Sequence, residues 1–202
     1  GELLERTDAS GVTLAQVQEA ALALTGDIAQ VPSSVSAIKV DGKRAYARVR
    51  AGEQVDLPAR PVTVSRFTLD DLRPAADGAM DVEAVVTCSS GTYVRALARD
   101  LGAALGVGGH LTRLRRTRVG GVTLDDARTL EVLADELVVL GLDQAARASF
   151  PSVDLDEERA GEVRFGRPLR DFTLGAEGPV AVFAPDGTFL ALYEQRDADA
   201  RP

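Results

Sequence analysis

The sequence is short of the side chains that build disulfides, zinc sites and aromatic cores. It contains one Cys, one His, one Met and no Trp, with six Phe and three Tyr as its aromatic residues. One Cys cannot form a disulfide within the chain, which fits a reducing, cytoplasmic location, and one Cys with one His supplies too few ligands for a structural zinc ion. The single His, His110, follows two glycines and has no visible partner, so a loop residue is favoured over an acid or base.

Long hydrophobic runs are also absent. No apolar stretch approaches the roughly 18 residues that cross a bilayer, so we predict no membrane-spanning helix. No Ser occupies a nucleophile-elbow pattern, and the glycines at 106–109 follow a predicted helix instead of preceding one, which argues against a phosphate-binding loop. What remains is a globular balance of 45% hydrophobic and 27% charged residues.

The net charge of −8 is spread unevenly along the chain. Residues 1–124 contain 15 Lys or Arg and 14 Asp or Glu, whereas residues 125–202 contain 8 and 17. This asymmetry favours two modules, of which the first can approach a polyanion and the second, as a whole, repels one. Because the chain becomes acidic and polar near 143–155, we predict domains at 1–147 and 148–202.

Hydrophobic periodicity and turn residues predict a chain of mixed helices and strands. Thr13 is the expected N-cap of the first helix, and the alternation of apolar residues over 80–88 predicts one buried strand face. The sequence Pro185-Asp186-Gly187 predicts a hairpin turn. The expected helices cover 13–24, about 44–51, 93–105 and a stretch after Thr123, and the expected strands cover 35–40 (followed by an Asp41-Gly42 turn), 62–69, 80–88, 179–183 and 188–193.

The most informative stretch is 88–120, which joins a strand, a turn of small residues, a helix and an arginine-rich extended strand. It contains six Arg, at positions 95, 99, 113, 115, 116 and 118, and one acid, Asp100. Arg95 and Arg99 lie four residues apart on a predicted helix, so both can point at one ligand. Guanidinium groups stay charged and form forked hydrogen bonds to phosphate, so RNA is favoured over a merely solvated surface.

Three further features each have two interpretations. The basic cluster of residues 39–50 either binds phosphate or is a solvated charged face. The turn Ser89-Ser90-Gly91-Thr92 either brings backbone amides to a ligand or is a connection in which a hydroxyl caps the next helix. Tyr93 either stacks on a displaced base or belongs to the core with its hydroxyl hydrogen-bonded.

Two segments together resemble the TruB family of bacterial tRNA pseudouridine-55 synthases. The run CSSGTYVRALARDLGAALG, followed by LRRTRVG, is similar to the third motif region of that family. The run QVPSSVSAIKVDGKRAYARVRAG at 30–52 is similar to its Q-x-P-x-x-S-A-x-K-x-x-G-x-x-x-Y stretch, with Lys39, Gly42 and Tyr46 in place. Both occur in the family's order and spacing, and the region from about 150 is similar to the PUA-like domain that ends many members.

The resemblance implies an α+β fold with a mixed β-sheet and flanking helices, of the pseudouridine-synthase type, plus a small β-rich PUA-like C-terminal domain. It implies the T-arm of tRNA as partner and a reaction that needs neither cofactor nor metal. In that reaction a uridine of the T-loop is flipped out, its glycosidic bond is broken, and the base is rejoined through carbon. Flipping agrees with the general need to extrude a stacked base before it can react.

The resemblance also assigns roles to residues of this chain. Tyr93 aligns with a Tyr that packs against the flipped base, Arg95 with an Arg that pairs with the catalytic carboxylate, and Leu114 with a Leu that lines the base pocket. A neighbouring guanidinium keeps a buried carboxylate ionised by lowering its pKa. The remaining substrate-binding residues implied are Lys39, Arg115 and Arg116, with phosphate contact and structural pairing both open to the two arginines.

The catalytic nucleophile of the family is an Asp in a motif of the type G-H-x-G-x-L-D-P, and the 202 residues contain no such string. We therefore expect the chain to be the C-terminal part of a synthase, monomeric and inactive alone, with sheet edges left unpaired. The alternative is a non-catalytic RNA-binding or RNA-folding protein derived from the same fold. Fortuitous arginines on an acidic structural domain are disfavoured by the double match.

Overall fold

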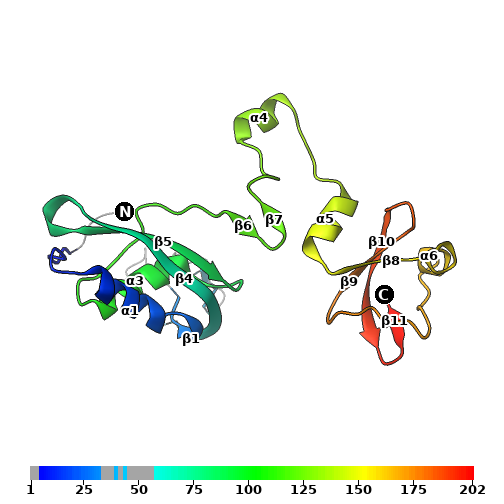
Figure 1. The fold of residues 1–202 in the computed structure, drawn as a ribbon, viewed down its shortest axis with the longest axis horizontal. Helices are drawn as coiled ribbons and strands as arrows, with labels where there is room; N and C mark the ends of the chain where they lie inside the picture. The colour runs from blue at the N-terminus through cyan, green and yellow to red at the C-terminus, as the bar shows by residue number, and fades with distance from the viewer. Residues whose placement is uncertain (1–4, 33–38, 41–42, 45–56) are drawn as a thin grey trace. The chain divides into compact units, whose positions relative to one another are not determined.

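The computed structural model describes residues 5–32, 39–40, 43–44 and 57–202 (Figure 1). They divide into two compact units, Gly1–Leu114 and Arg115–Pro202, which we describe one at a time. Both units combine helices with β-sheet, as expected for the predicted α+β class. Over the described ranges, we find no helix whose length and apolar character would suit it to crossing a membrane.

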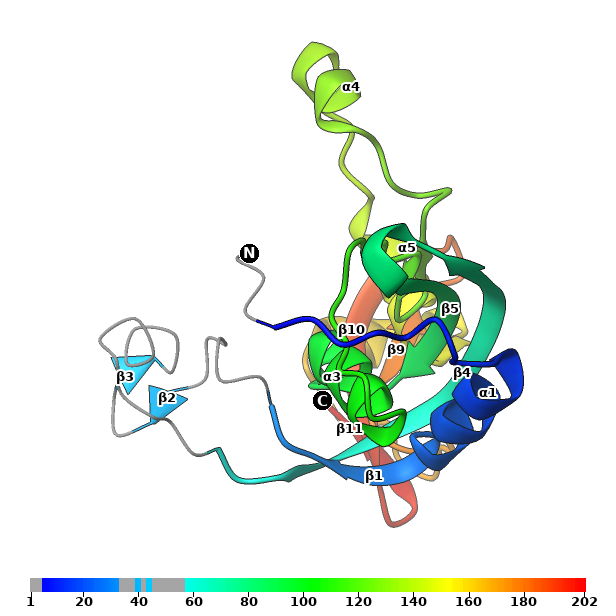
Figure 2. The ribbon, with the colours of Figure 1, turned by 90° about the vertical axis from the view of Figure 1, so that its left-hand side faces the viewer.

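The first unit is built on a three-stranded antiparallel sheet of order β1-β4-β5 (Figure 2). Its strands are β1 (Gly26–Gln30), β4 (Arg60–Pro74) and β5 (Met80–Cys88). Strand β4 is longer than the predicted 62–69, because its pairing with β5 continues through two register shifts to the 3-10 turn η1 (Ala76–Gly78). The central strand thus fixes both neighbours in register.

Helix α1 (Leu14–Ala23) begins as the sequence predicts. Thr13 and Gln16 form a capping box, in which the Thr13 hydroxyl accepts from the Gln16 N–H and the Gln16 side chain accepts from the Thr13 N–H at 2.8 Å. The buried face of α1 presents Val17 and Ala21 to a cluster that includes Phe67 of β4.

Helix α3 (Val94–Ala104) also confirms its prediction of 93–105. Leu97 and Leu101 are buried, and Leu101 joins the cluster below α1. The two helices therefore share one core with the sheet, and the start of α3 lies where β5 ends.

The predicted buried face of β5 is wrong, because no residue of this strand is buried. Val82, Ala84 and Val86 stand opposite Leu72, Leu69 and Phe67 of β4, and directly opposed residues of an antiparallel pair share a face. The core that contains α1 includes those β4 side chains but none from β5. The alternation correctly predicted a strand, but no helix or strand among the described residues packs on this edge strand to bury its apolar face.

The basic cluster at 39–50 is described only in part. Strands β2 (Lys39–Val40) and β3 (Lys43–Arg44) form an antiparallel pair in which Lys39 stands opposite Arg44. Arg44 is therefore in a strand and does not begin the helix predicted over 44–51. The rest of that helix, the Asp41-Gly42 turn and most of the strand 35–40 lie outside the described residues.

The second unit contains a four-stranded sheet of order β11-β10-β9-β8. Strands β8 and β9 are parallel and the other pairs antiparallel. The predicted hairpin is confirmed, since the Ala184 carbonyl accepts from the Gly187 N–H and the Asp186 carboxylate from the Thr188 N–H. The elements are β6 (Arg118–Val119), β7 (Val122–Thr123), α4 (Leu130–Asp135), α5 (Leu142–Ser149), β8 (Ser152–Asp154), α6 (Glu157–Arg164), β9 (Val180–Phe183), β10 (Phe189–Arg196) and β11 (Asp199–Arg201).

The helix predicted directly after Thr123 is wrong. The Asp126 carboxylate accepts from the Thr123 N–H at 2.9 Å, which closes a turn that resembles a helix start. No helix follows it, and α4 begins at Leu130 with Thr129 as its N-cap. Ser, Thr and Asp stabilise isolated turns as well as helix ends, so the pattern at Thr123 and Asp126 is compatible with either a helix start or an isolated turn.

Tyr193 anchors the core of the second unit and allows a direct stability test. Its side chain is buried, and its hydroxyl donates to the Arg167 carbonyl at 2.6 Å. Burial also raises the pKa of this hydroxyl. We expect Tyr193→Phe to lower the free energy of unfolding by about 1 kcal/mol, since the hydrogen bond of a buried side chain is lost. Urea unfolding followed by circular dichroism measures this.

Tyr93→Phe is the matched control. Its hydroxyl makes no hydrogen bond with the described residues, so the same substitution there is expected to leave the unfolding free energy unchanged. Equal effects of the two substitutions would contradict the assignment of the Tyr193 hydrogen bond.

Candidate RNA-binding site

The candidate site begins where β5 passes into α3. Ser89 continues the strand pairing, because its N–H donates to the Thr63 carbonyl at 2.8 Å and its hydroxyl accepts from the Thr63 N–H at 3.1 Å. Gly91 then takes φ +81°, a left-handed conformation that suits glycine. Of the two interpretations of this turn, a hydroxyl that caps α3 is not observed, because the N-cap is Tyr93 and no side-chain cap bond is present.

The backbone of Tyr93 is held by Gln30, the last residue of β1. The Gln30 side-chain oxygen accepts from the Tyr93 N–H at 2.8 Å, and its side-chain nitrogen lies 3.3 Å from the Tyr93 carbonyl. Gln30 is 2% exposed and is the one buried polar side chain in the described ranges. It was missed as a site residue, although it opens the matched segment at 30–52.

The two arginines of α3 differ in what they contact. Arg99 donates to the Val31 carbonyl at 2.8 Å and to the Asp100 carboxylate at 2.7 Å. Arg95 is exposed and makes no hydrogen bond or ion pair within the described part of the chain. The expectation that both point at one ligand is therefore wrong for Arg99, whose guanidinium holds α3 against the chain that leaves β1.

The glycine-rich segment after α3 is packed directly against the helix. The carbonyl of Gly102 accepts from the N–H groups of Val107 and Gly108, at 3.1 and 3.0 Å. A Cβ atom on Gly102 would overlap the Gly108 backbone, and one on Gly109 would overlap the Ala98 carbonyl. The glycines thus allow a close backbone approach that fixes where the arginine-rich run leaves the helix.

The arginine-rich run itself is exposed and largely irregular. Leu114, predicted to line a base pocket, is 62% exposed at the end of the first unit. The predicted extended strand is limited to Arg118–Val119, which forms a short hairpin with β7. Arg115 and Arg116 precede it in the second unit. In the described structure, no hydrogen bond or ion pair engages any side chain of this group, which comprises Arg113, Arg115, Arg116 and Arg118.

The arginines of the C-terminal sheet region behave differently. Arg159 pairs with Asp156, the N-cap of α6, and the Arg159 N–H lowers the pKa of that carboxyl. Arg164 and Arg167 pair with Glu157 and Glu162, both at 3.1 Å. These guanidinium groups already have anionic partners, whereas the arginines of 113–118, which no described residue engages, are available for phosphate.

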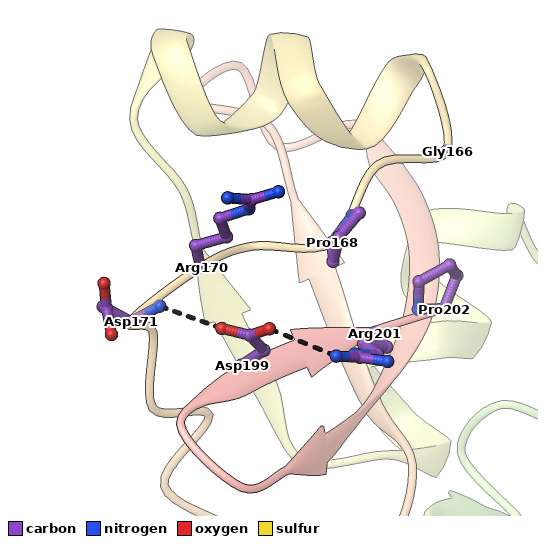
Figure 3. A pocket seen from close by; sticks show the side chains of 7 residues that line it. All are labelled: Gly166, Pro168, Arg170, Asp171, Asp199, Arg201 and Pro202. Carbon is purple, nitrogen blue, oxygen red and sulfur yellow. Dashed lines mark hydrogen bonds and ion pairs between the residues drawn. The ribbon is translucent and has the colours of Figure 1, made fainter.

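A shallow pocket of about 620 Å³ lies in the C-terminal unit, and none of the predicted site residues lines it (Figure 3). It is lined by charges of both signs, and the Asp199 carboxylate accepts from the Asp171 N–H at 3.3 Å and from Arg201 at 3.4 Å. This balance of charge gives the pocket no preference for an anion. Its lining residues are Gly166, Pro168, Arg170, Asp171, Asp199, Arg201 and Pro202.

Among the described residues, no cluster of three or more His, Cys, Asp or Glu side chains is arranged to hold a metal ion. Cys88 is a free thiol at the end of β5, and His110 is exposed in the loop after α3. Neither side chain has a partner that would make it a nucleophile or a base within the described hydrogen bonds. The chemistry that the described side chains offer is anion binding and aromatic stacking.

Comparison of sequences matches the whole chain to the domains of one family. Residues 1–94 match the N-terminal domain of the TruB family pseudouridylate synthases. Residues 95–150 match the C-terminal domain of tRNA pseudouridylate synthase B, and residues 150–202 match the C-terminal region of tRNA pseudouridine synthase II.

Curated relatives give the same family. The chain is 55% identical over 210 residues to tRNA pseudouridine synthase B of Arthrobacter sp. (strain FB24), covering 100% of the chain and 69% of the relative. It is 56% identical over 205 residues to the protein of that name from Streptomyces griseus subsp. griseus, covering 100% and 68%. The chain thus spans about two thirds of the length of these relatives.

Solved structures similar to the chain confirm the α+β fold. A Cbf5–Nop10–Gar1 complex contains a chain with TM-score 0.62 and 21% identity, covering 91% of this chain and 55% of that one. An H/ACA RNP bound to a substrate RNA containing 2'-deoxyuridine gives TM-score 0.61 and 19% identity, with coverage of 91% and 54%. At these identities the likeness concerns the fold alone.

A Gly→Ala substitution inside a helix normally stabilises a protein, but the close backbone approach at Gly102 predicts that Gly102→Ala destabilises it. We expect Gly102→Ala to destabilise the first unit by about 1–3 kcal/mol, because the added methyl group forces the 106–109 segment away from α3. In Gly161→Ala, another helical glycine gains a methyl group in open space, which should stabilise α6 by about 0.5–1 kcal/mol. Urea unfolding monitored by circular dichroism measures both, and a stabilising Gly102→Ala would contradict the packing described.

Proposed function

This chain belongs to the TruB family of pseudouridylate synthases, and we propose that it is the RNA-binding part of a synthase that converts uridine-55 of the tRNA T-loop to pseudouridine. The observation that carries the proposal is the set of arginines at 113–118, none of which is engaged by the described residues. A surface arginine without an anionic partner retains its full capacity for phosphate. The same applies to Arg95 at the start of α3.

In this proposal, different residues bind the base and the phosphate backbone, and base recognition begins at the start of α3. Tyr93 offers an aromatic face to the flipped uracil, and Leu114 contributes apolar contact in the base pocket. Base–aromatic stacking tolerates any base and contributes roughly 1–3 kcal/mol, so selection of the uridine requires further contacts from the synthase and from the fold of the T-arm. Lys39, Arg115 and Arg116 bind the phosphate backbone in this proposal.

Arg95 has a separate proposed role. Isomerisation requires a carboxylate nucleophile that remains ionised when buried, and a guanidinium alongside it favours the charged form and lowers its pKa. Arg95 is exposed and not engaged by the described residues, as expected of a side chain that pairs with a carboxylate outside them. The reaction needs no external reactant, because the C1′–N1 glycosidic bond that breaks is replaced by a C1′–C5 bond in the same nucleotide, and the proton lost from C5 is balanced by one gained at N1.

We further propose that the 202 residues alone do not catalyse this reaction. They contain no G-H-x-G-x-L-D-P string to supply the Asp nucleophile. None of their other carboxylates occurs in a matching sequence context, so the role is transferred to none of them. The alternative function is RNA binding without catalysis, which the arginines at 113–118 would also support.

We propose that the partner is the T-arm of tRNA, that a monomer binds it, and that the protein acts in the cytoplasm. The domain boundary near residue 147 remains a proposal, with the synthase fold before it and a PUA-like domain after it. The acidic C-terminal region is not expected to make extensive RNA contacts, because its arginines are largely paired within the unit.

Salt dependence of tRNA binding tests the proposal. Filter binding of an unmodified tRNA transcript should give an affinity that falls steeply with salt, because each phosphate contact releases counterions. The double variant Arg115→Ala/Arg116→Ala should weaken binding and reduce the slope of log K against log salt by about 1–2. A slope of zero for the unmodified chain would eliminate both the synthase and the RNA-binding alternative.

The matched control is the double variant Arg164→Ala/Arg167→Ala. It removes the same charge from two arginines that are ion-paired within the second unit. We expect its salt slope to equal that of the unmodified chain. Equal losses in the two double variants would show that net charge, and not the arginine-rich run, governs binding.

A further inference from the structure

The side chain of Gln30 pairs with both backbone groups of a single residue, Tyr93. Its oxygen accepts from the Tyr93 N–H at 2.8 Å, and its nitrogen lies 3.3 Å from the Tyr93 carbonyl. A primary amide offers a donor and an acceptor in one plane, which is the arrangement that a neighbouring strand presents to a hydrogen-bonded residue. The amide thus holds Tyr93 as a paired strand residue at the point where a helix begins.

We infer that Gln30 is a positioning residue for RNA recognition, which sets the direction of the Tyr93 ring by fixing the Tyr93 backbone before RNA binds. The inference rests on the proposed function, in which Tyr93 contacts the flipped base. Gln30 itself touches no substrate in this account, because it is 2% exposed. It acts through the φ and ψ angles of Tyr93, which determine where the side chain leaves the backbone.

The junction needs this contact because its own sequence leaves it loosely specified. The turn before Tyr93 contains Gly91 with φ +81°, and the helix start has no side-chain cap bond. In a capping box, a residue three positions into the helix bonds the N-cap N–H. At α3 that N–H is bonded instead by Gln30, which is 63 residues away in the sequence.

A second contact from the next residue of the chain completes the clamp. Arg99 donates to the Val31 carbonyl at 2.8 Å, while its Nε donates to Asp100 at 2.7 Å. Gln30 and Val31 therefore contact α3 at residues 93 and 99, which are separated by more than one helical turn. Two contacts at separate turns restrict both the position and the rotation of the helix, so that Tyr93 and Arg95 are presented in fixed directions.

Burial keeps the amide in place. A buried polar group that leaves its partners has no water to replace them, and the Gln30 side chain is the one buried polar side chain in the described ranges. The Tyr93 carbonyl also accepts from the Ala96 and Leu97 N–H groups, at 2.9 and 3.1 Å. Loss of the amide would thus leave the Tyr93 N–H, and not the carbonyl, without a partner.

The test uses Gln30→Met, which keeps the length of the side chain and removes both hydrogen bonds. The matched control is Gln18→Met, the same change at an exposed position of α1. The 202-residue chain has three Tyr, so labelling with 3-fluorotyrosine gives three fluorine resonances, and Tyr93→Phe assigns one of them. We expect Gln30→Met to shift or broaden the Tyr93 resonance, to leave that of Tyr193 unchanged, and to weaken tRNA binding roughly tenfold.

A double-mutant cycle separates positioning from general support of the fold. If Gln30 acts through the Tyr93 ring, Gln30→Met should have little effect on tRNA affinity once Tyr93→Ala has removed that ring. An undiminished loss in the Tyr93→Ala background would overturn the inference, as would a Gln30→Met variant with unchanged affinity and an unshifted Tyr93 resonance.

Amide exchange of the unmodified chain tests the clamp without any substitution. With 15N-tyrosine labelling, the Tyr93 N–H should exchange slowly, and exchange at the rate of an open amide would overturn the inference even if Gln30→Met failed to fold. Failure of the proposed function can be distinguished from failure of this inference. The first would appear as salt-independent tRNA binding by the unmodified chain, whereas the fluorine and amide-exchange measurements report on the contact between Gln30 and Tyr93 in either case.

Discussion

The pairing of β4 with β1 on one side and β5 on the other is the constraint on which the first unit depends. β1 and β5 run in the same direction on either side of β4, with Gly26 and Cys88 both opposite Val64, so that the chain leaving β5 reaches the end of β1, where Gln30 bonds to Tyr93. Helix α3 starts from that place and is held by contacts from β1 and from the chain just beyond it. The predicted base-contacting residue is therefore positioned by residues that are far apart in sequence and have no RNA-binding role themselves.

The arginines fall into two physical classes, and that division supports the proposed function more than their number does. Arg99, Arg159, Arg164 and Arg167 have carboxylate partners or backbone acceptors within the fold. The arginines at 113–118 are exposed and not engaged by any described side chain. Exposed ion pairs add little stability, so the pairs of Arg159, Arg164 and Arg167 contribute little to the fold, whereas Arg99 holds α3 through the Val31 carbonyl. The second class maintains a positive potential that a polyanion can neutralise.

The sequence predicted what local interactions determine. The N-cap at Thr13, the helix over 93–105 and the turn at Pro185-Asp186-Gly187 each depend on neighbouring residues, and all are confirmed. Two failures depend on distant partners: Arg99 is bound by a carbonyl 68 residues away, and no described element covers the face of β5. The helix expected after Thr123 failed for a local reason, because Asp126 closes a turn there that is not followed directly by a helix. Local patterns could not identify Gln30, because they predicted no strand at 26–30 and its partner, Tyr93, is 63 residues away.

Release of tritium from tRNA that carries 5-tritiated uridine tests the central claim most directly. The 202-residue chain would be compared with a version to whose start a G-H-x-G-x-L-D-P-bearing segment of a TruB relative is joined. Our account predicts release by the joined protein and none by the 202 residues, since only the first contains the Asp nucleophile. Release of tritium by the 202-residue chain would contradict the account, because one of its own carboxylates would then perform the chemistry. Absence of release by both proteins would favour the non-catalytic RNA-binding alternative.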